Sequence, residues 1–346
     1  MTLNVGLIGA GMIGHDHARR LERVVAGARV SAVADVDLER ARDLAAGMPG
    51  ALTYASGHDI IASPQVDAVV VASSGPTHEP YVLAAIAAGK PVFCEKPLAP
   101  GPDACLRIVE AEVASGRHLV QVGFMRRYDP GYQAMRQALR DGLIGAPLLA
   151  HCAHRNPSVP GTYTSDMPLT DTAVHEMDAM RWLLADEVVA VSVLLPRRNG
   201  RAPSHLADPQ VLLMETATGT LVDVEINLSC AYGYDIRCEL VGETGTVTLD
   251  SPAGCTLRGN GTASQAIPAD WRERFGPAYD AELQVWADTV AAGHDGCAAG
   301  AATSWDGYKA AAICEAALAA LDSGQRTPVV TKDRPAFYAD AASPRP

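Results

Sequence analysis

The segment TDTAVHEMDAMRWLL, residues 170–184, holds three side chains whose types and spacing could support acid–base chemistry. In an α-helix, residues three and four positions apart lie on one face, so Asp171, His175 and Asp178 would form one stripe. An imidazole titrates near neutral pH, and a neighbouring carboxylate can orient it and stabilise its charged form. The stripe is therefore a candidate for proton transfer; the alternative is a solvated polar face on an amphipathic helix.

A glycine-rich turn near the N-terminus follows an apolar run at 3–8 and precedes an amphipathic helix. Its GxGxxG spacing fits a tight turn at Gly9, approach of the backbone to a pyrophosphate at Gly11, and packing of the helix on the strand at Gly14. The helix N-terminus would offer amide groups and a positive dipole to the phosphates. The cofactor contacts expected at this turn are Gly9, Gly11, Met12, Ile13 and Gly14.

The next apolar run, RVSAVAD at 29–35, ends in an acidic residue at the position of a ribose-binding carboxylate. Asp35 could bind both ribose hydroxyls and would repel the 2′-phosphate of NADP. Val36 and Asp37 follow, and no arginine is present there to bind that phosphate, so NAD is favoured. We expect Asp35 and Val36 to contact NAD; the alternative is that Asp35 caps the following helix.

Apolar runs continue to alternate with helical patterns up to residue 124, with strands expected at 67–73, 91–97 and 118–124. This alternation predicts a parallel, doubly wound sheet, in which ligands bind beyond the carboxyl ends of the strands. The residues expected at those ends, and so beside the cofactor, are Ser73, Ser74, Gly75, His78, Glu95 and Lys96.

Lys96 is singled out by composition, because the chain has only four lysines and one of them stands at a strand end that points at the cofactor. Lysine is a compact donor whose pKa shifts readily, which suits donation to a reacting oxygen. Pro97 restricts the backbone of Lys96, and the bond between them can be cis. The alternative is an exposed lysine at the end of a strand.

Composition narrows the class of protein. The 346 residues are enough for about two domains, and the net charge of −12 argues against nucleic acid as a partner. We found no apolar run of membrane-spanning length and no signal segment, which excludes a membrane partner at this stage. The eight cysteines form no CxxC pair, which favours reduced thiols in the cytoplasm.

After about residue 124 the pattern changes, and strands follow one another in hairpins of an antiparallel sheet. A Pro-rich segment from Asp333 is expected to be a loose or docking tail. The other elements expected in this part are a helix closing on Gly142, a strand at 148–157, hairpin turns at Thr218-Gly219 and Glu243-Thr244-Gly245, and helices at about 270–292 and 303–322.

Several segments together resemble a known family of oxidoreductases. GLIGAGMIG, CEKPLA and DTAVHEMD are similar to the glucose–fructose oxidoreductase/inositol dehydrogenase/rhizopine-catabolism (Gfo/Idh/MocA) family. HCAHRNP and YGYDI are more specific and resemble its inositol dehydrogenase branch, as do LVQVGFMRRYD, YTSDM and SWDGY. The resemblance runs from about residue 3 to about residue 338 without a large gap.

This resemblance implies an α/β fold with two domains. The first would be an NAD-binding Rossmann domain at 1–122, and the second an α+β domain at 123–340 with a large, mainly antiparallel, open-faced sheet. In this family the free face of that sheet often mediates tetramers, so a homotetramer is expected. The branch implies NAD-dependent oxidation of myo-inositol, a small cyclic polyol, to 2-keto-myo-inositol (scyllo-inosose).

The resemblance also implies site residues. The catalytic set of the inositol branch falls on Lys96, Asp171 and His175. Its polyol contacts fall on Met125, Arg126, His154, Asn156, Thr172, Asp178 and Tyr234. Each contact has an alternative: His154 and Asn156 could satisfy loop backbone groups, and Arg126 could be a structural ion-pair partner.

The residues suggest how the reaction would divide between them. Oxidation of a secondary alcohol removes a proton from oxygen and a hydride from carbon, and NAD takes the hydride. His175 is the candidate base, Asp171 would orient it, and Lys96 would stabilise the developing alkoxide.

Other chemistries stay open at this point. A metal at Asp171 and His175 is disfavoured because no HExxH motif or ligand set accompanies them. A sibling enzyme could oxidise scyllo-inositol, chiro-inositol or an aldose such as glucose, since the sequence does not fix which hydroxyl faces the nicotinamide. A non-catalytic NAD-binding regulator is the remaining class, but it would not need Lys96 and His175 together.

Overall fold

The computed structural model describes residues 2–249 and 256–339, which form two compact units. The first unit contains residues up to Met125 together with 279–311 and 332–339, and the second contains the rest. The segment 279–311 therefore belongs by its contacts to the first unit, although the sequence prediction assigned it to the second domain. Asp250, the last residue of an expected hairpin, and the tail beyond residue 339 lie outside the described residues.

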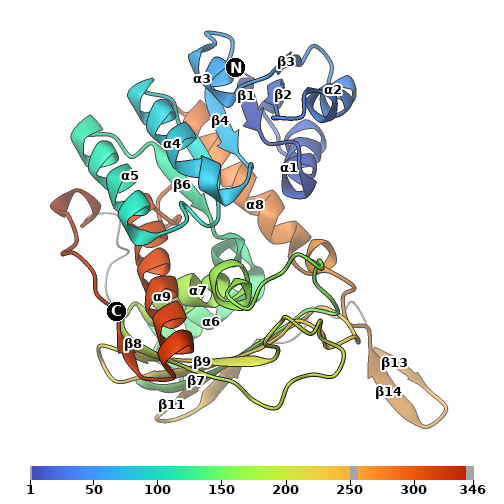
Figure 1. The fold of residues 1–346 in the computed structure, drawn as a ribbon, viewed down its shortest axis with the longest axis vertical. Helices are drawn as coiled ribbons and strands as arrows, with labels where there is room; N and C mark the ends of the chain where they lie inside the picture. The colour runs from blue at the N-terminus through green and yellow to red at the C-terminus, as the bar shows by residue number, and fades with distance from the viewer. Residues whose placement is uncertain (1, 250–255, 340–346) are drawn as a thin grey trace. The chain divides into compact units, whose positions relative to one another are not determined.

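The sheet of the first unit is parallel throughout, in the order β3-β2-β1-β4-β5-β6 (Figure 1). This is the strand order of a dinucleotide-binding Rossmann fold, and it confirms the predicted doubly wound sheet. The short β3 was not predicted, because three residues are too few for a periodic pattern. The strands are β1 (Leu3–Ile8), β2 (Ala28–Ala34), β3 (Leu52–Tyr54), β4 (Ala68–Val71), β5 (Val92–Glu95) and β6 (Val120–Gly123).

Helices cover both faces of this sheet, as the alternation of side chains along β1 shows. Leu3, Val5 and Leu7 belong to one buried cluster with residues of α1, α2 and the later part of α8. The intervening Gly6 and Ile8 face α3, where Ile60 and Gly57 approach them. The helices are α1 (Met12–Arg23), α2 (Leu38–Ala46), α3 (Gly57–Ala62), α4 (His78–Ala87), α5 (Pro102–Ser115) and parts of α8 (Trp271–Ala291) and α9 (Ser304–Ser323).

The sheet of the second unit has seven strands in the order β12-β11-β7-β10-β9-β8-β15. Among the described residues of this sheet only β7 and β10 pair in parallel, so the predicted mainly antiparallel sheet is confirmed. Both predicted hairpin turns are present, between β9 and β10 and between β11 and β12. The strands are β7 (Pro147–Arg155), β8 (Val188–Leu194), β9 (Gln210–Thr216), β10 (Leu221–Asn227), β11 (Asp235–Gly242), β12 (Thr246–Thr248) and β15 (Thr327–Pro328).

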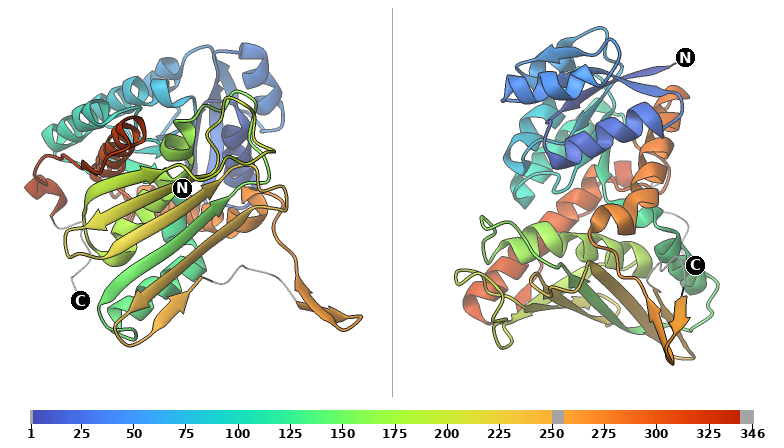
Figure 2. Two further views of the ribbon diagram at one scale, coloured as in Figure 1. Left: turned by 60° about the horizontal axis from the view of Figure 1, so that its bottom comes forward. Right: turned by 90° about the vertical axis from the view of Figure 1, so that its right-hand side faces the viewer.

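Helices α6 (Pro130–Arg140) and α7 (Val174–Leu184) lie across one face of this second sheet (Figure 1). Figure 2 (left) shows the opposite face, which no helix covers within the described part of the unit. Alternation along the strands agrees, because Ala150, Cys152 and His154 of β7 are buried on the helix side. A separate hairpin of β13 (Thr256–Gly259) and β14 (Thr262–Gln265) was not predicted.

The segment that follows Asp333 docks on the first unit as far as the structure describes it. Tyr338 is fully buried, and its hydroxyl donates to Glu112 at 2.7 Å and lies 2.8 Å from Ser304 Oγ. Ser304 Oγ donates to the same Glu112 carboxyl, whose pKa is raised by burial. The ring of Phe337 stacks on His118 at 3.9 Å between centroids. Of the two predicted possibilities, a loose or a docking tail, this part of the tail docks.

None of the helices within residues 2–249 and 256–339 combines the length and the apolar composition needed to cross a membrane.

We expect the substitution Tyr338→Phe to lower the free energy of unfolding by about 1–3 kcal/mol, because the buried Glu112 carboxyl loses a hydrogen-bond donor. Denaturant unfolding followed by circular dichroism measures the change. Tyr54→Phe is the matched control, since the Tyr54 hydroxyl makes no hydrogen bond to any described residue. Equal stability of the two variants would show that the docked tail contributes nothing through this hydroxyl.

Candidate active site

The segment predicted to form one helix contains two kinds of helix. Residues Pro168–Thr172 form a π-helix, and α7 follows from Val174. Asp171 lies in the π-helix, where the turn is wider, so α-helical spacing applies only to His175 and Asp178. Every residue from Val174 to Leu183 is buried. The alternative of a solvated polar face is therefore wrong, and the polar side chains of α7 lie in an interior that requires partners for them.

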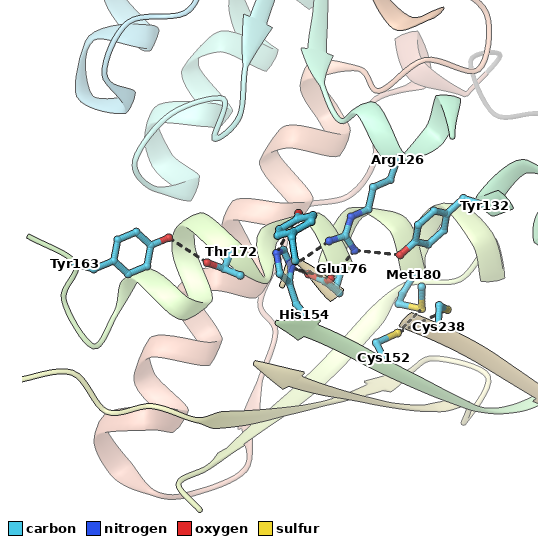
Figure 3. Close-up of polar contacts among 10 residues, drawn as sticks. Arg126, Tyr132, Cys152, His154, Tyr163, Thr172, Glu176, Met180 and Cys238 are labelled. Atoms are coloured by element: carbon cyan, nitrogen blue, oxygen red, sulfur yellow. Dashed lines mark hydrogen bonds and ion pairs between the residues drawn. The ribbon is translucent and has the colours of Figure 1, made fainter. Parts of the chain in front are cut away.

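Tyr163 was not predicted as a site residue, but its side chain bonds to Asp171, which was. The Tyr163 hydroxyl donates to Asp171 Oδ2. It also lies 3.0 Å from Thr172 Oγ1 (Figure 3). Because its proton goes to the carboxylate, Tyr163 accepts from Thr172. Burial of the ring and the nearby Asp171 charge raise the pKa of Tyr163, which keeps it a donor. The only sequence signal was its place in the YTSDM segment.

Arg126, His154 and Glu176 form a buried charged cluster (Figure 3). Arg126 Nη1 donates to Glu176 Oε1, and His154 Nδ1 lies 3.0 Å from the same oxygen. Burial by itself raises the pKa of Glu176, but Arg126 and His154 outweigh it and lower the pKa to about 2. Arg126 thus does have the ion-pair partner considered as its alternative role, and His154 bonds to side chains of the cluster.

Asp178 pairs with an arginine that was not selected, Arg127. Arg127 Nε donates to Oδ2 at 2.9 Å, and Nη2 donates to Oδ1 at 2.5 Å. Both partners are buried. A bidentate pair of this kind fixes the plane of the carboxylate, and it occupies one lone pair on each oxygen.

The remaining predicted substrate contacts differ in surroundings. Tyr234 is buried, with its hydroxyl 3.4 Å from His154 Nε2, and burial raises its pKa. Asn156 follows β7, and its Oδ1 is a buried oxygen to which no described residue donates. Thr172 is buried beside Tyr163. Met125 is buried at the end of the first unit. The orphaned Asn156 oxygen is the atom that a hydroxyl-rich ligand would satisfy.

The glycine-rich turn of the first unit has the close contacts that its spacing predicted. Gly9 has φ +103°, and a Cβ there would lie 2.5 Å from the backbone nitrogen of Ser73. A Cβ on Gly14 would lie 1.9 Å from the carbonyl oxygen of Gly9. A Cβ on Gly11 would meet only open space, and this residue is the N-cap of α1 without a side-chain cap. The amides at this helix start are therefore left available to an anion.

Asp35 follows β2 and is held by backbone amides, with Oδ2 accepting from Ala10 at 2.7 Å and Oδ1 from Asp37 at 2.9 Å. The cap of α2 is Asp37, which accepts from Glu39 and Arg40, so the alternative that Asp35 is the cap is wrong. Beside it, the apolar side chains of Val36 and Met12 are 93% and 63% exposed. Ile13, next to Met12, is half-buried. Exposed apolar groups beside a fixed carboxylate fit the adenosine half of a dinucleotide.

The residues after β4 separate into exposed and buried groups. Ser74 is exposed, while Ser73 and Gly75 are half-buried at the start of a short 3₁₀ turn. His78 is buried, and its ring nitrogens lie 2.7 Å from the carbonyl oxygen of Pro97 and 2.9 Å from that of Ser73. His78 therefore joins the ends of β4 and β5 through the backbone.

Glu95 and Lys96 end β5 in different environments. Glu95 is buried, with Oε1 2.6 Å from His17 Nε2 and Oε2 accepting from the amide of Lys96 at 3.1 Å. Lys96 is half-buried, and the Lys96–Pro97 bond is cis, as the sequence allowed. The Glu95 carboxylate thus faces into the unit and holds the backbone of Lys96, with His17 as a partner that the sequence analysis did not select.

The two units divide the predicted residues between them. Lys96 and the NAD contacts belong to the first unit, and Asp171, His175 and the polyol contacts other than Met125 belong to the second. No group of three or more His, Cys, Asp or Glu side chains suited to a metal ion occurs among residues 2–249 and 256–339.

Two family models match the chain. Residues 3–124 match the oxidoreductase family with an NAD-binding Rossmann fold, and residues 132–248 match the GFO/IDH/MocA C-terminal domain. The first match lies within the first unit and the second within the second unit, and the segments of both units after residue 248 lie outside the two matches.

Named relatives align along nearly the whole chain. Inositol 2-dehydrogenase 3 of Saccharopolyspora erythraea is 57% identical over 338 residues, which are 98% of each chain. Inositol 2-dehydrogenase of Pseudomonas fluorescens is 52% identical over 340 residues, which are 98% of this chain and 100% of that one. A crystal structure of myo-inositol dehydrogenase from Lactobacillus casei in complex with NAD(H) and myo-inositol matches with a TM-score of 0.94 and 37% identity, covering 98% of this chain and 100% of that one.

Because both family models match and relatives more than 50% identical span almost the full length, the chain belongs to the GFO/IDH/MocA family of NAD-binding oxidoreductases.

Proposed function

We propose that the protein is an NAD-dependent inositol 2-dehydrogenase that oxidises myo-inositol to 2-keto-myo-inositol (scyllo-inosose). The observation that carries this proposal is the near-complete match to the Lactobacillus casei myo-inositol dehydrogenase solved with NAD(H) and myo-inositol. The inositol 2-dehydrogenases of more than 50% identity support it. The buried Asn156 oxygen without a donor and the charged cluster around Glu176 suit a ligand rich in hydroxyls.

The residues of the first unit fit NAD. Gly9 and Gly14 form the tight turn, and the open space at Gly11 and the uncapped start of α1 suit a pyrophosphate. Asp35 would bind the ribose hydroxyls, each carboxylate oxygen having a lone pair left beside its bond to an amide. The other proposed contacts are Met12, Ile13, Val36, Ser73, Ser74 and Gly75, with His78 and Glu95 supporting the backbone around them.

When bound, NAD accepts the hydride that leaves the oxidised carbon. His175 is the proposed base that takes the hydroxyl proton, because an imidazole accepts protons near neutral pH. Asp171 would orient His175 and stabilise its charged form, and Tyr163 fixes Asp171 by donating to Oδ2. Lys96 would stabilise the negative charge that develops on the substrate oxygen.

The proposed polyol contacts differ in the groups that they offer. Arg126 can only donate hydrogen bonds, whereas Asn156 and Thr172 can both donate and accept them. Asp178 is proposed to contact the ring with the lone pairs that Arg127 leaves, and Met125 with its apolar side chain. His154 and Tyr234 complete the set, with the Tyr234 hydroxyl kept neutral by burial.

We further propose a cytoplasmic homotetramer formed through the helix-free face of the second sheet. Leu149 of β7 and Leu221 of β10 are neighbours in the register and are both exposed, on the strand side opposite to the buried residues. An exposed apolar pair in mid-sheet is typical of an interface. The seven described cysteines are free thiols, which suits a reducing compartment.

The first test is a substrate and cofactor panel followed by absorbance of the reduced nicotinamide. We expect myo-inositol with NAD to give the highest kcat/KM, and NADP to be at least about tenfold poorer because Asp35 repels its 2′-phosphate. A preference for scyllo-inositol, chiro-inositol or glucose would replace the proposal by the corresponding sibling activity. No turnover on any polyol would favour a non-catalytic NAD-binding regulator.

We expect His175→Ala to lower kcat by about 10²–10⁴-fold, because the proton of the hydroxyl loses its acceptor. Binding of NAD, measured by calorimetry, should change little, since the proposed NAD contacts belong to the first unit. His294→Ala is the matched control, because His294 is exposed at the end of α8. Near-normal turnover of a folded His175→Ala protein would contradict the assignment of the base.

For the assembly, we expect multi-angle light scattering to give a mass four times that of the 36.3 kDa chain. Leu149→Glu should reduce that mass, because a charge buried in an apolar interface without a partner is unfavourable. Leu143→Glu is the matched control, since Leu143 is exposed on the turn before β7 and not on the sheet face. A monomeric wild-type protein would rule out the tetramer.

A further inference from the structure

Glu176, a buried carboxylate that the sequence analysis did not select, lies between two of the proposed polyol contacts. Its side chain is 1% exposed. Arg126 Nη1 donates to Oε1, and His154 Nδ1 lies 3.0 Å from Oε1 and 3.1 Å from Oε2. Figure 3 shows Arg126 and His154 converging on this carboxylate from the start of the second unit and from β7. One residue of α7 thus contacts two side chains that are far apart in the sequence.

The charge of Glu176 is the counterpart of the Arg126 charge. Burial would raise the pKa of Glu176, but the arginine and the histidine lower it, so the carboxylate is ionised at neutral pH. Burial in turn lowers the pKa of Arg126, but Glu176, together with Tyr132 and Tyr234, more than reverses that effect. A neutral side chain at position 176 would deprive the buried guanidinium of this counter-ion.

The same carboxylate determines where the proton of His154 lies. Arg126 Nη2 is also 3.0 Å from His154 Nδ1, but a guanidinium only donates, while an ionised carboxylate only accepts. A bond from Nδ1–H to the charged carboxylate is the stronger arrangement. In the neutral imidazole the proton is therefore on Nδ1, which leaves Nε2 as an acceptor; the Tyr234 hydroxyl lies 3.4 Å from Nε2.

We propose that Glu176 is a positioning residue for substrate recognition, which holds Arg126 as a donor and His154 Nε2 as an acceptor. This inference rests on the proposed function, in which Arg126 and His154 contact the polyol. It assigns to Glu176 no contact with the reacting atoms, because its carboxylate is occupied by the two side chains that it orients.

Fixed roles matter for a ligand whose groups are all alike. A hydroxyl group can both donate and accept, so the pose of a cyclic polyol is defined only when the protein groups around it cannot exchange roles. Arg126 cannot accept in any state, but an imidazole can carry its proton on either nitrogen. Without the Glu176 charge, His154 can place its proton on Nε2 and present a donor where an acceptor is required.

The first experiment compares Glu176→Gln with the wild-type enzyme. We expect the KM for myo-inositol to rise about 10–100-fold, the effect of losing hydrogen bonds to a charged group, while the dissociation constant for NAD stays within about twofold. Glu176→Asp keeps the charge on a shorter side chain and should recover part of the lost affinity. Glu112→Gln is the matched control, since it replaces a buried carboxyl of the first unit by an amide and should lower stability without changing this KM.

A second measurement does not depend on activity or on the folding of a Glu176 variant. Nitrogen-15 NMR of the wild-type protein with labelled histidine, with His154 assigned by substitution, reports which ring nitrogen carries the proton. We expect Nδ1 of His154 to be protonated and Nε2 to be bare. The opposite tautomer, or a His154 ring with a proton on both nitrogens, would overturn the proposal.

The kinetic outcomes are equally separable. A folded Glu176→Gln protein with reduced thermal stability but a wild-type KM for myo-inositol would mean that Glu176 only stabilises the fold, and the proposal would be wrong. If the wild-type protein oxidises no polyol, the proposed function fails instead. In that case the tautomer of His154 still decides whether Glu176 positions it.

Discussion

A charge that is removed from water must be paired, and α7 places several ionisable side chains in the interior of the second unit. Glu176 is paired by Arg126, Asp178 by Arg127, and Arg181 by Glu187. Removing one partner of a buried pair such as Arg126–Glu176 or Arg127–Asp178 typically costs about 3–5 kcal/mol. The Arg181–Glu187 pair contributes less, because Glu187 is 43% exposed and solvent screens it. The 3₁₀ turn before α6 and the connection to β8 are therefore held to α7 by charge as well as by packing. These ion pairs restrain the side chains of the proposed substrate site.

The first unit forms its proposed NAD site mainly from backbone groups. At Gly9 and Gly14 a Cβ atom would collide with neighbouring main-chain atoms, so the turn requires glycine at both positions. The carboxylate proposed to bind the ribose, Asp35, is itself held by two amides. A phosphate ligand is recognised by amides and a helix dipole, which are the same in every sequence that folds this way. A polyol has no such charge, so the second unit must supply specific side chains with fixed donor and acceptor roles.

This difference explains what could be predicted from the sequence. The Rossmann unit, its turn and the paired hairpins follow from local patterns, and the structure confirms them. The π-helix at 168–172, the short β3 and the β13–β14 hairpin were not predicted, because no periodic pattern marks them. Tyr163 was also missed, since its value lies in a bond to Asp171 that only the folded loop creates. The return of 279–311 to the first unit likewise depends on contacts distant in the sequence.

The ion pairs of Arg126 and Arg127 with α7 join distant parts of the chain, but the spacing of their residues is visible in the sequence. Arg126 and Arg127 are adjacent, and Glu176 and Asp178 lie two positions apart on a helix, which places these carboxylates on different sides of it. In the folded protein each arginine has its own carboxylate, because Glu176 pairs with Arg126 and Asp178 pairs with Arg127. The predicted stripe included Asp178 but not Glu176, because a stripe contains the residues of one helix face. A helix that is buried on all sides has buried side chains on every face. On such a helix each ionisable side chain needs a partner of opposite charge, and the partners of Glu176 are Arg126 and His154.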